Sequence, residues 1–191
     1  GAQLGVTDML GDDQYYLTIY NTSRTSNPKQ LLTNWNFIFT KVDLGKRTNF
    51  AYGIYRFKGE FFEIGDQGTI DPVAENRYGG FFQISYPLSK FERIETSVNV
   101  SRFQRESVLG SLLPVDGAVV SNFVNYSFDN SLWGSTGPLD GSRTNVTLGY
   151  TTDIYRAQQN YYTAILDYRN YMRLTTRSAF AFRSLVEVND G

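Results

Sequence analysis

The sequence predicts an all-β protein, a transmembrane antiparallel up-and-down β-barrel. Apolar and polar residues alternate with a period of two in one segment after another, as expected for strands that separate lipid from water. The 14 Tyr, 14 Phe and 17 Gly suit strands and a protein with two lipid–water interfaces. No stretch of about 18 apolar residues is present, so a membrane helix is not expected. We expect residues 1–191 to form one domain.

The first half of the chain contains five segments with this alternation. The first segment runs from Ala2 to Thr7, and Gly11 and Asp12 predict the turn that follows it. Residues 65–76 are rich in Gly, Asp and Pro and predict a longer loop before the fifth segment. On the predominantly apolar side these segments place Leu4 and Val6; Tyr15, Leu17 and Ile19; Trp35, Phe37 and Phe39; Phe50, Tyr52 and Ile54; and Tyr78, Gly80, Phe82, Ile84 and Tyr86.

The second half contains five more segments, with predicted loops at residues 110–117 and 134–141. Their apolar sides hold Ile94, Thr96, Val98 and Val100; Val120, Val124, Tyr126 and Phe128; Val146, Leu148 and Tyr150; Tyr162, Ala164, Leu166 and Tyr168; and Phe180 and Phe182. The sequence therefore predicts about ten strands. We expect short connections at Gly11, Lys46, Ser89 and Thr175 to alternate with longer ones near Asn27, Gly68, Gly110 and Arg156, as in outer-membrane barrels.

The apolar side is the predicted lipid-facing surface. The residues that we expect to contact lipid are Leu17, Ile19, Phe37, Ile54, Phe82, Ile84, Val98, Val124, Leu148, Leu166, Phe180 and Phe182. Aromatic residues near the predicted strand ends are expected to form girdles at the two interfaces: Tyr15, Tyr52, Tyr78, Tyr86, Tyr126, Phe128, Tyr150, Tyr162 and Tyr168.

Charged residues also occur in the middle of the predicted strands, on the opposite side. They are Arg93, Glu95, Asp167, Arg169, Arg177 and Arg183. A charge facing lipid would cost several kcal/mol, whereas charges facing a wet interior can pair across neighbouring strands. We expect these residues to line the lumen, either as a ladder that fixes strand register or as groups that tune conductance or hold a lumen-inserted loop.

The composition argues against several functions. The chain contains no Cys and no His, which removes thiolate and imidazole ligands and the usual catalytic triads. We therefore expect no enzyme activity, no metal site and no cofactor. The net charge of −1 gives no electrostatic footprint for nucleic acid. The glycine-rich residues 134–141 lack the Gly-Lys-Ser/Thr of a phosphate-binding loop, so we interpret them as a shaped connection.

Four phrases in the chain resemble a known family. They are residues 1–12 (GAQLGVTDMLGD), 86–95 (YPLSKFERIE), 132–138 (LWGSTGP) and 166–171 (LDYRNY). They resemble the C-terminal barrel of the bacterial surface-antigen family, which includes the BamA-type outer-membrane assembly factors. The resemblance is greatest to members whose barrel follows a TolB-like propeller. It implies a sixteen-stranded barrel, of which this chain would hold the first ten strands and lack the later loop with its Arg-Gly-aromatic signature. A smaller barrel that has lost the remaining strands is the alternative.

The resemblance implies a role at the bacterial outer membrane in the insertion or translocation of proteins. The partners would be membrane lipid, unfolded outer-membrane proteins and accessory lipoproteins. In such a barrel Ala2 to Thr7 would form one side of a weakly closed seam, with Gln3, Gly5 and Thr7 as the candidate seam residues and Gly5 weakening the pairing. A passive outer-membrane channel, or a structural anchor without a protein substrate, is the alternative. A third class is a soluble β-domain that acts as a binding module.

Overall fold

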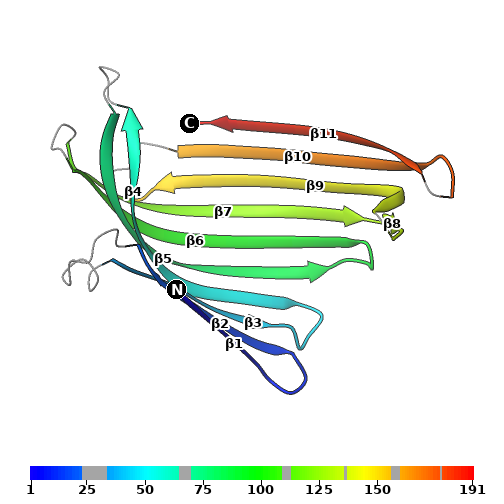
Figure 1. The fold of residues 1–191 in the computed structure, drawn as a ribbon, viewed down its shortest axis with the longest axis horizontal. Coiled ribbons are helices and arrows are strands. Elements are labelled where there is room, and N and C mark those ends of the chain that lie inside the picture. The colour runs from blue at the N-terminus through cyan, green and yellow to red at the C-terminus, as the bar shows by residue number, and fades with distance from the viewer. Residues whose placement is uncertain (23–33, 65–69, 109–112, 136, 156–159, 177) are drawn as a thin grey trace.

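A computed structural model describes residues 1–22, 34–64, 70–108, 113–135, 137–155, 160–176 and 178–191. These residues form one antiparallel sheet in which strands adjacent in sequence are neighbours in space, apart from the short β8 (Figure 1). The strands are β1 (Ala2–Thr7), β2 (Asp13–Asn21), β3 (Trp35–Asp43), β4 (Asn49–Ile64), β5 (Ile70–Pro87), β6 (Glu92–Ser107), β7 (Val115–Asp129), β8 (Leu132–Trp133), β9 (Pro138–Asp153), β10 (Asn160–Arg173) and β11 (Ala179–Asp190). The prediction of an all-β, antiparallel up-and-down fold is confirmed.

The described sheet is open. Its order runs from β1 to β11, and within the part of the chain described here these two strands each pair on one side only. The described residues are therefore not closed into a barrel. The sheet is nevertheless strongly curved, and β4, β5 and β6 bend away from the other strands at one end (Figure 1). No helix in the described residues is long and apolar enough to cross a membrane.

Three of the predicted loop limits were wrong. Residues 70–76, predicted as loop, belong to β5, and β7 begins at Val115 inside the predicted 110–117 loop. The 134–141 stretch is shorter than predicted, because β9 already begins at Pro138. The additional strand β8 consists of Leu132 and Trp133 and pairs with the start of β9. The ten predicted strands correspond to the ten strands on the main path of the sheet.

The connections are divided between the two ends of the sheet. The hairpins that join β1 to β2, β3 to β4, β5 to β6, β7 to β9 and β10 to β11 lie at one end, on the right of Figure 1. The strands β2, β4, β6 and β9 end at the opposite end of the sheet, which we call the loop end. Only residues 65–69 separate β4 from β5, because β4 ends later and β5 begins earlier than predicted. The predicted loop positions Asn27, Gly68, Gly110 and Arg156 lie outside the described residues.

Candidate functional site

The strand register brings the predicted lipid-facing residues onto one face of the sheet. Phe82 pairs with Val98, Thr96 with Val124, and Val124 in turn with Leu148. Two residues that pair directly across neighbouring strands point to the same side of the sheet, and so does every second residue along each strand. All the residues predicted to contact lipid lie on this side: Leu17, Ile19, Phe37, Ile54, Phe82, Ile84, Val98, Val124, Leu148, Leu166, Phe180 and Phe182. We call it the apolar face.

The apolar face is exposed and the opposite, polar face is the less accessible one. Along β6, Val98 and Val100 are 39% and 48% exposed, whereas the polar-face residue Ser101 is 5% exposed. The same contrast separates Leu148, at 57%, from Ser85, at 8%. Side chains converge on the inner side of a curved sheet, so the pattern indicates that the polar face is concave. This is the reverse of a water-soluble sheet, which buries its apolar side.

On the apolar face, strands such as β4 and β6 have an uncharged stretch that covers only part of their length. No charged side chain lies on it between Tyr78 and Tyr86 on β5, nor between Ile94 and Val100 on β6. Just beyond the β6 stretch, at the loop end, the same side carries Arg102, and on β4 it carries Arg56. The apolar face therefore forms a belt with polar side chains beyond it.

Aromatic residues occur at both borders of the belt. At the hairpin border the guanidinium of Arg47 lies 4.9 Å from the ring centre of Tyr86, and the ammonium of Lys41 lies 5.4 Å from that of Tyr15. At the loop-end border Tyr150 pairs in register with Tyr162, and their ring centres are 5.0 Å apart. All the residues predicted for the girdles lie on this face: Tyr15, Tyr52, Tyr78, Tyr86, Tyr126, Phe128, Tyr150, Tyr162 and Tyr168.

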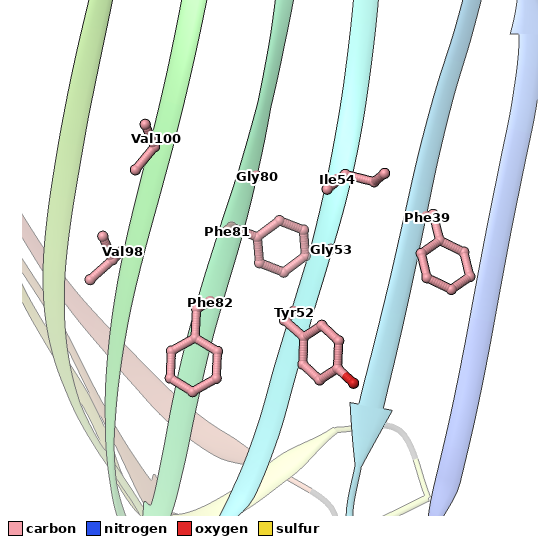
Figure 2. A pocket seen from close by; sticks show the side chains of 9 residues that line it. All are labelled: Phe39, Tyr52, Gly53, Ile54, Gly80, Phe81, Phe82, Val98 and Val100. Carbon is pink, nitrogen blue, oxygen red and sulfur yellow. The ribbon is translucent and has the colours of Figure 1, made fainter.

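A shallow hollow interrupts the belt where Gly80 contributes no side chain. Gly80 pairs with Ile54 on one side and with Val100 on the other, and both of these side chains rise beside it. Figure 2 shows this hollow with Phe82, Tyr52 and Val98 along the same surface. It is lined almost entirely by carbon, apart from the hydroxyl of Tyr52.

Five of the six predicted lumen charges lie on the polar face, where they form two separate clusters. In the first, Asp167 accepts hydrogen bonds from Arg169 at 2.7 Å and from Arg183 at 3.0 Å. The second surrounds Glu95, which pairs with Arg93 at 3.3 Å and accepts a hydrogen bond from Asn125. The sixth predicted charge, Arg177, lies outside the described residues. Cross-strand pairing of this kind stabilises the alignment of neighbouring strands.

Sequence reasoning missed a third charged cluster, near the loop end of the polar face. Glu75 on β5 pairs with Arg77 at 2.8 Å and with Arg105 on β6 at 2.7 Å. Partial burial acts to raise the pKa of Glu75, but the hydrogen bonds from Arg105 and Arg77 outweigh it and lower that pKa below its usual 4.5. The sequence does contain Glu75 and Arg77 at alternate positions, but the predicted loop concealed the strand that carries them.

The polar face also contains pairs of an aromatic residue and a glycine directly opposite it on the next strand. Gly53 pairs with Phe81, Gly117 with Phe103, and Gly149 with Phe123. A Cβ placed on Gly53 would lie 2.9 Å from the Phe81 ring, and one on Gly117 would lie 2.5 Å from the ring of Phe103. The rings therefore occupy the space that the glycines leave, the arrangement known as aromatic rescue.

A buried side chain marks the point where β4 leaves β3. The register of β3 with β4 ends at Phe37 opposite Arg56. Beyond it, the fully buried Asn36 accepts a hydrogen bond from the backbone N–H of Lys58 and donates one to the hydroxyl of Thr22. The Thr22 hydroxyl donates in turn to the carbonyl of Lys58. Side chains thus replace the backbone ladder as β4 bends away.

The candidate seam strand β1 lies at one edge of the described sheet. Gln3, Gly5 and Thr7 have their side-chain positions on the polar face and pair with Thr18, Tyr16 and Gln14. Gly5 does not interrupt this pairing, and the ring of Tyr16 lies 3.5 Å from the place of its missing Cβ. All residues of β1 are exposed.

Neither face presents an arrangement for metal chemistry among the described residues, where no group of three or more Asp or Glu side chains could hold an ion. No family model matches the chain, and no curated protein matches it significantly. The two faces and the edge strand are therefore the features from which a function can be argued.

Proposed function

We propose that the sheet is part of an outer-membrane β-barrel of the surface-antigen type, which acts in the insertion or translocation of proteins. The observation that carries the membrane part of this proposal is the exposed apolar face that extends across the strands of the sheet. A soluble protein rarely leaves so large an apolar surface in contact with water. Lipid would cover the apolar face, and the paired charges of the polar face would lie toward an aqueous interior.

The dimensions of the belt support this placement. At about 3.3 Å per residue, the eight steps from Tyr78 to Tyr86 cover about 26 Å along β5. A strand tilt of about 40° reduces this to about 20 Å, near the band of about 25 Å typical of outer-membrane barrels. The tyrosines at its borders would meet the lipid headgroups.

The protein-handling part of the proposal combines the family resemblance with the edge strand. An exposed edge with free backbone groups can pair with an incoming strand, and β1 has such an edge within the described sheet. Its six residues make few contacts compared with the long inner strands, which suits a seam that must open. Substrate strands would align beside Gln3, Gly5 and Thr7.

Lipid exposure can be tested residue by residue, because the chain has no native Cys. Single cysteines at Val98 and Leu148 would carry a fluorophore, and matched cysteines at Ser97 and Thr163 would place it on the polar face. After reconstitution into vesicles, we expect quenchers attached to the acyl chains to quench the first pair strongly and the second pair weakly. Equal quenching at all four positions would contradict the membrane proposal.

Substrate handling needs a separate test in the membrane. A photo-cross-linker at Gln3 or Gly5 should capture an incoming outer-membrane protein, whereas one at Thr18, which has strands on both sides, should not. A passive channel would be favoured by a different set of results. The belt residues would be exposed to lipid and the chain would conduct steadily in planar bilayers, but no cross-links would form at β1.

A further inference from the structure

The cluster of Glu75, Arg77 and Arg105 lies outside the belt, on the polar face of the bent portion of β4, β5 and β6. The carboxylate of Glu75 holds both guanidinium groups, in each case through the Nε atom of the arginine. Glu75 accepts from Nε of Arg77 through one oxygen and from Nε of Arg105 through the other. Each arginine is therefore anchored at the inner end of its guanidinium group.

Aromatic rings hold the same two groups in place. The guanidinium of Arg77 lies 5.4 Å from the ring centre of Phe103, and that of Arg105 lies 5.3 Å from the ring centres of both Phe103 and Phe61. Contacts of this kind favour a fixed guanidinium plane. The donors at the outer end of each group thus have little conformational freedom to lose on binding a ligand.

Those outer donors are available. In the described part of the chain, the hydrogen bonds of Arg77 and Arg105 use only Nε, so the two Nη atoms of each guanidinium group have no acceptor among the described residues. About a third of each side chain is exposed, against 16% for Glu75. The two arginines line a hollow together with Phe57 and Phe61.

We propose that Arg77 and Arg105 form a binding site for a phosphate group at the loop end of the polar face. Two guanidinium groups against one carboxylate leave a net positive charge, and the Nη forks match the geometry of phosphate oxygens. Glu60 borders the hollow on β4, but alternation along the strand assigns its side chain to the other face of the sheet, away from the two arginines. The phenylalanine rings offer an apolar surface for the remainder of a phosphate ester. This site does not rest on the proposed membrane function.

The experiment follows the arginine side chains of the folded chain by ¹⁵N NMR during addition of inorganic phosphate, with sodium chloride at equal ionic strength as the reference. Phenyl phosphate and a soluble short-chain phosphatidic acid form two further arms, which distinguish a free ester from a lipid headgroup by their relative affinity. We expect the signals of Arg77 and Arg105 to shift and that of Arg143, which pairs with Asp129 near the hairpins, to stay.

The variants R77Q and R105Q should each weaken phosphate binding about tenfold or more, because each removes a charged hydrogen-bonding fork. The matched variant R143Q should leave it unchanged. If either glutamine variant fails to fold, R77K and R105K keep the charge while removing the fork, and they should weaken binding as well. Identical shifts in phosphate and chloride, or undiminished binding by folded R77Q/R105Q or R77K/R105K, would overturn the proposal.

Discussion

The ring of Phe123 on β7 occupies the space in which a Cβ of Gly149 on β9 would lie. The two residues are direct partners in the ladder, so the fit depends on the exact register of these strands. Substitution of Gly149 by Ala should displace the ring and reduce the free energy of unfolding by about 1 to 3 kcal/mol, the usual cost of overpacking. Urea unfolding measured by intrinsic fluorescence gives this quantity.

The matched control is Gly59→Ala, because nothing lies within 4 Å of a Cβ at Gly59 on β4. There the substitution should be neutral or stabilise the protein by up to about 1 kcal/mol, since alanine loses less backbone entropy on folding. Equal destabilisation by both substitutions would show that the loss of glycine itself, and not the ring, is responsible.

The side chain of Asn36 serves as the acceptor for the backbone N–H of Lys58 where β4 bends. Asn36→Ala should lower the free energy of unfolding by about 1 to 3 kcal/mol, because a buried donor loses its partner. Asn122→Ala is the control, since the Asn122 side chain lies on the apolar face and takes no part in this bend. Hydrogen exchange at Lys58 should become faster in the first variant only; unchanged exchange there would contradict the assigned role.

Glu75 should make stability depend on pH. Its pKa in the folded state lies below the usual 4.5, so the ionised group contributes stability that is complete above 4.5 and is lost as the pH falls through the folded-state value. Glu75→Gln removes this contribution. The free-energy difference between the native protein and the variant should therefore be largest near neutral pH and shrink below about pH 4.5. A difference that stays constant with pH would count against the ion pairs.

A charge in the middle of the belt should be far more costly in a bilayer than one on the opposite face. Val98→Arg should reduce the free energy of folding into vesicles by about 2 to 4 kcal/mol, the cost found near the bilayer midplane. Ser97→Arg, one residue away on the polar face, should change it much less. Folding titrations in phospholipid vesicles measure both, and comparable losses would argue against lipid as the partner of this face.

The period-two pattern was sufficient to predict the ten main strands and which residues of a strand share a side. Alternation is a local property, so Val98 and Leu148 could be assigned to the same side without knowing which strands pair. The start of β5 was missed because Asp71 and Pro72 suggest a loop. Pro72 is tolerated because it lies just outside the β5 pairing with β6, which begins at Val73, so its missing N–H costs at most one hydrogen bond.

The specific contacts could not be predicted because they depend on register. Phe81 meets Gly53, and Arg105 meets Glu75, only after the strands have been aligned. Both pairs join residues far apart in the chain, with no sequence signal that links them. The role of Asn36 was equally hidden, since it arises from the bend of a neighbouring strand. The two-residue strand β8 is too short to show alternation.

The aromatic rescue pairs are not spread evenly over the sheet. Within the strands, the tight pairs join β4 to β5, β6 to β7 and β7 to β9, whereas Gly5 and Tyr16 at the β1 edge fit more loosely. At the other flank, Gly191 just after β11 lies close to the ring of Tyr161. A ring over a glycine shields the adjacent peptide groups from water competing for their hydrogen bonds. Unzipping of the sheet should consequently start at the β1 edge and reach the central strands later. β1 can then separate while the middle of the sheet stays intact.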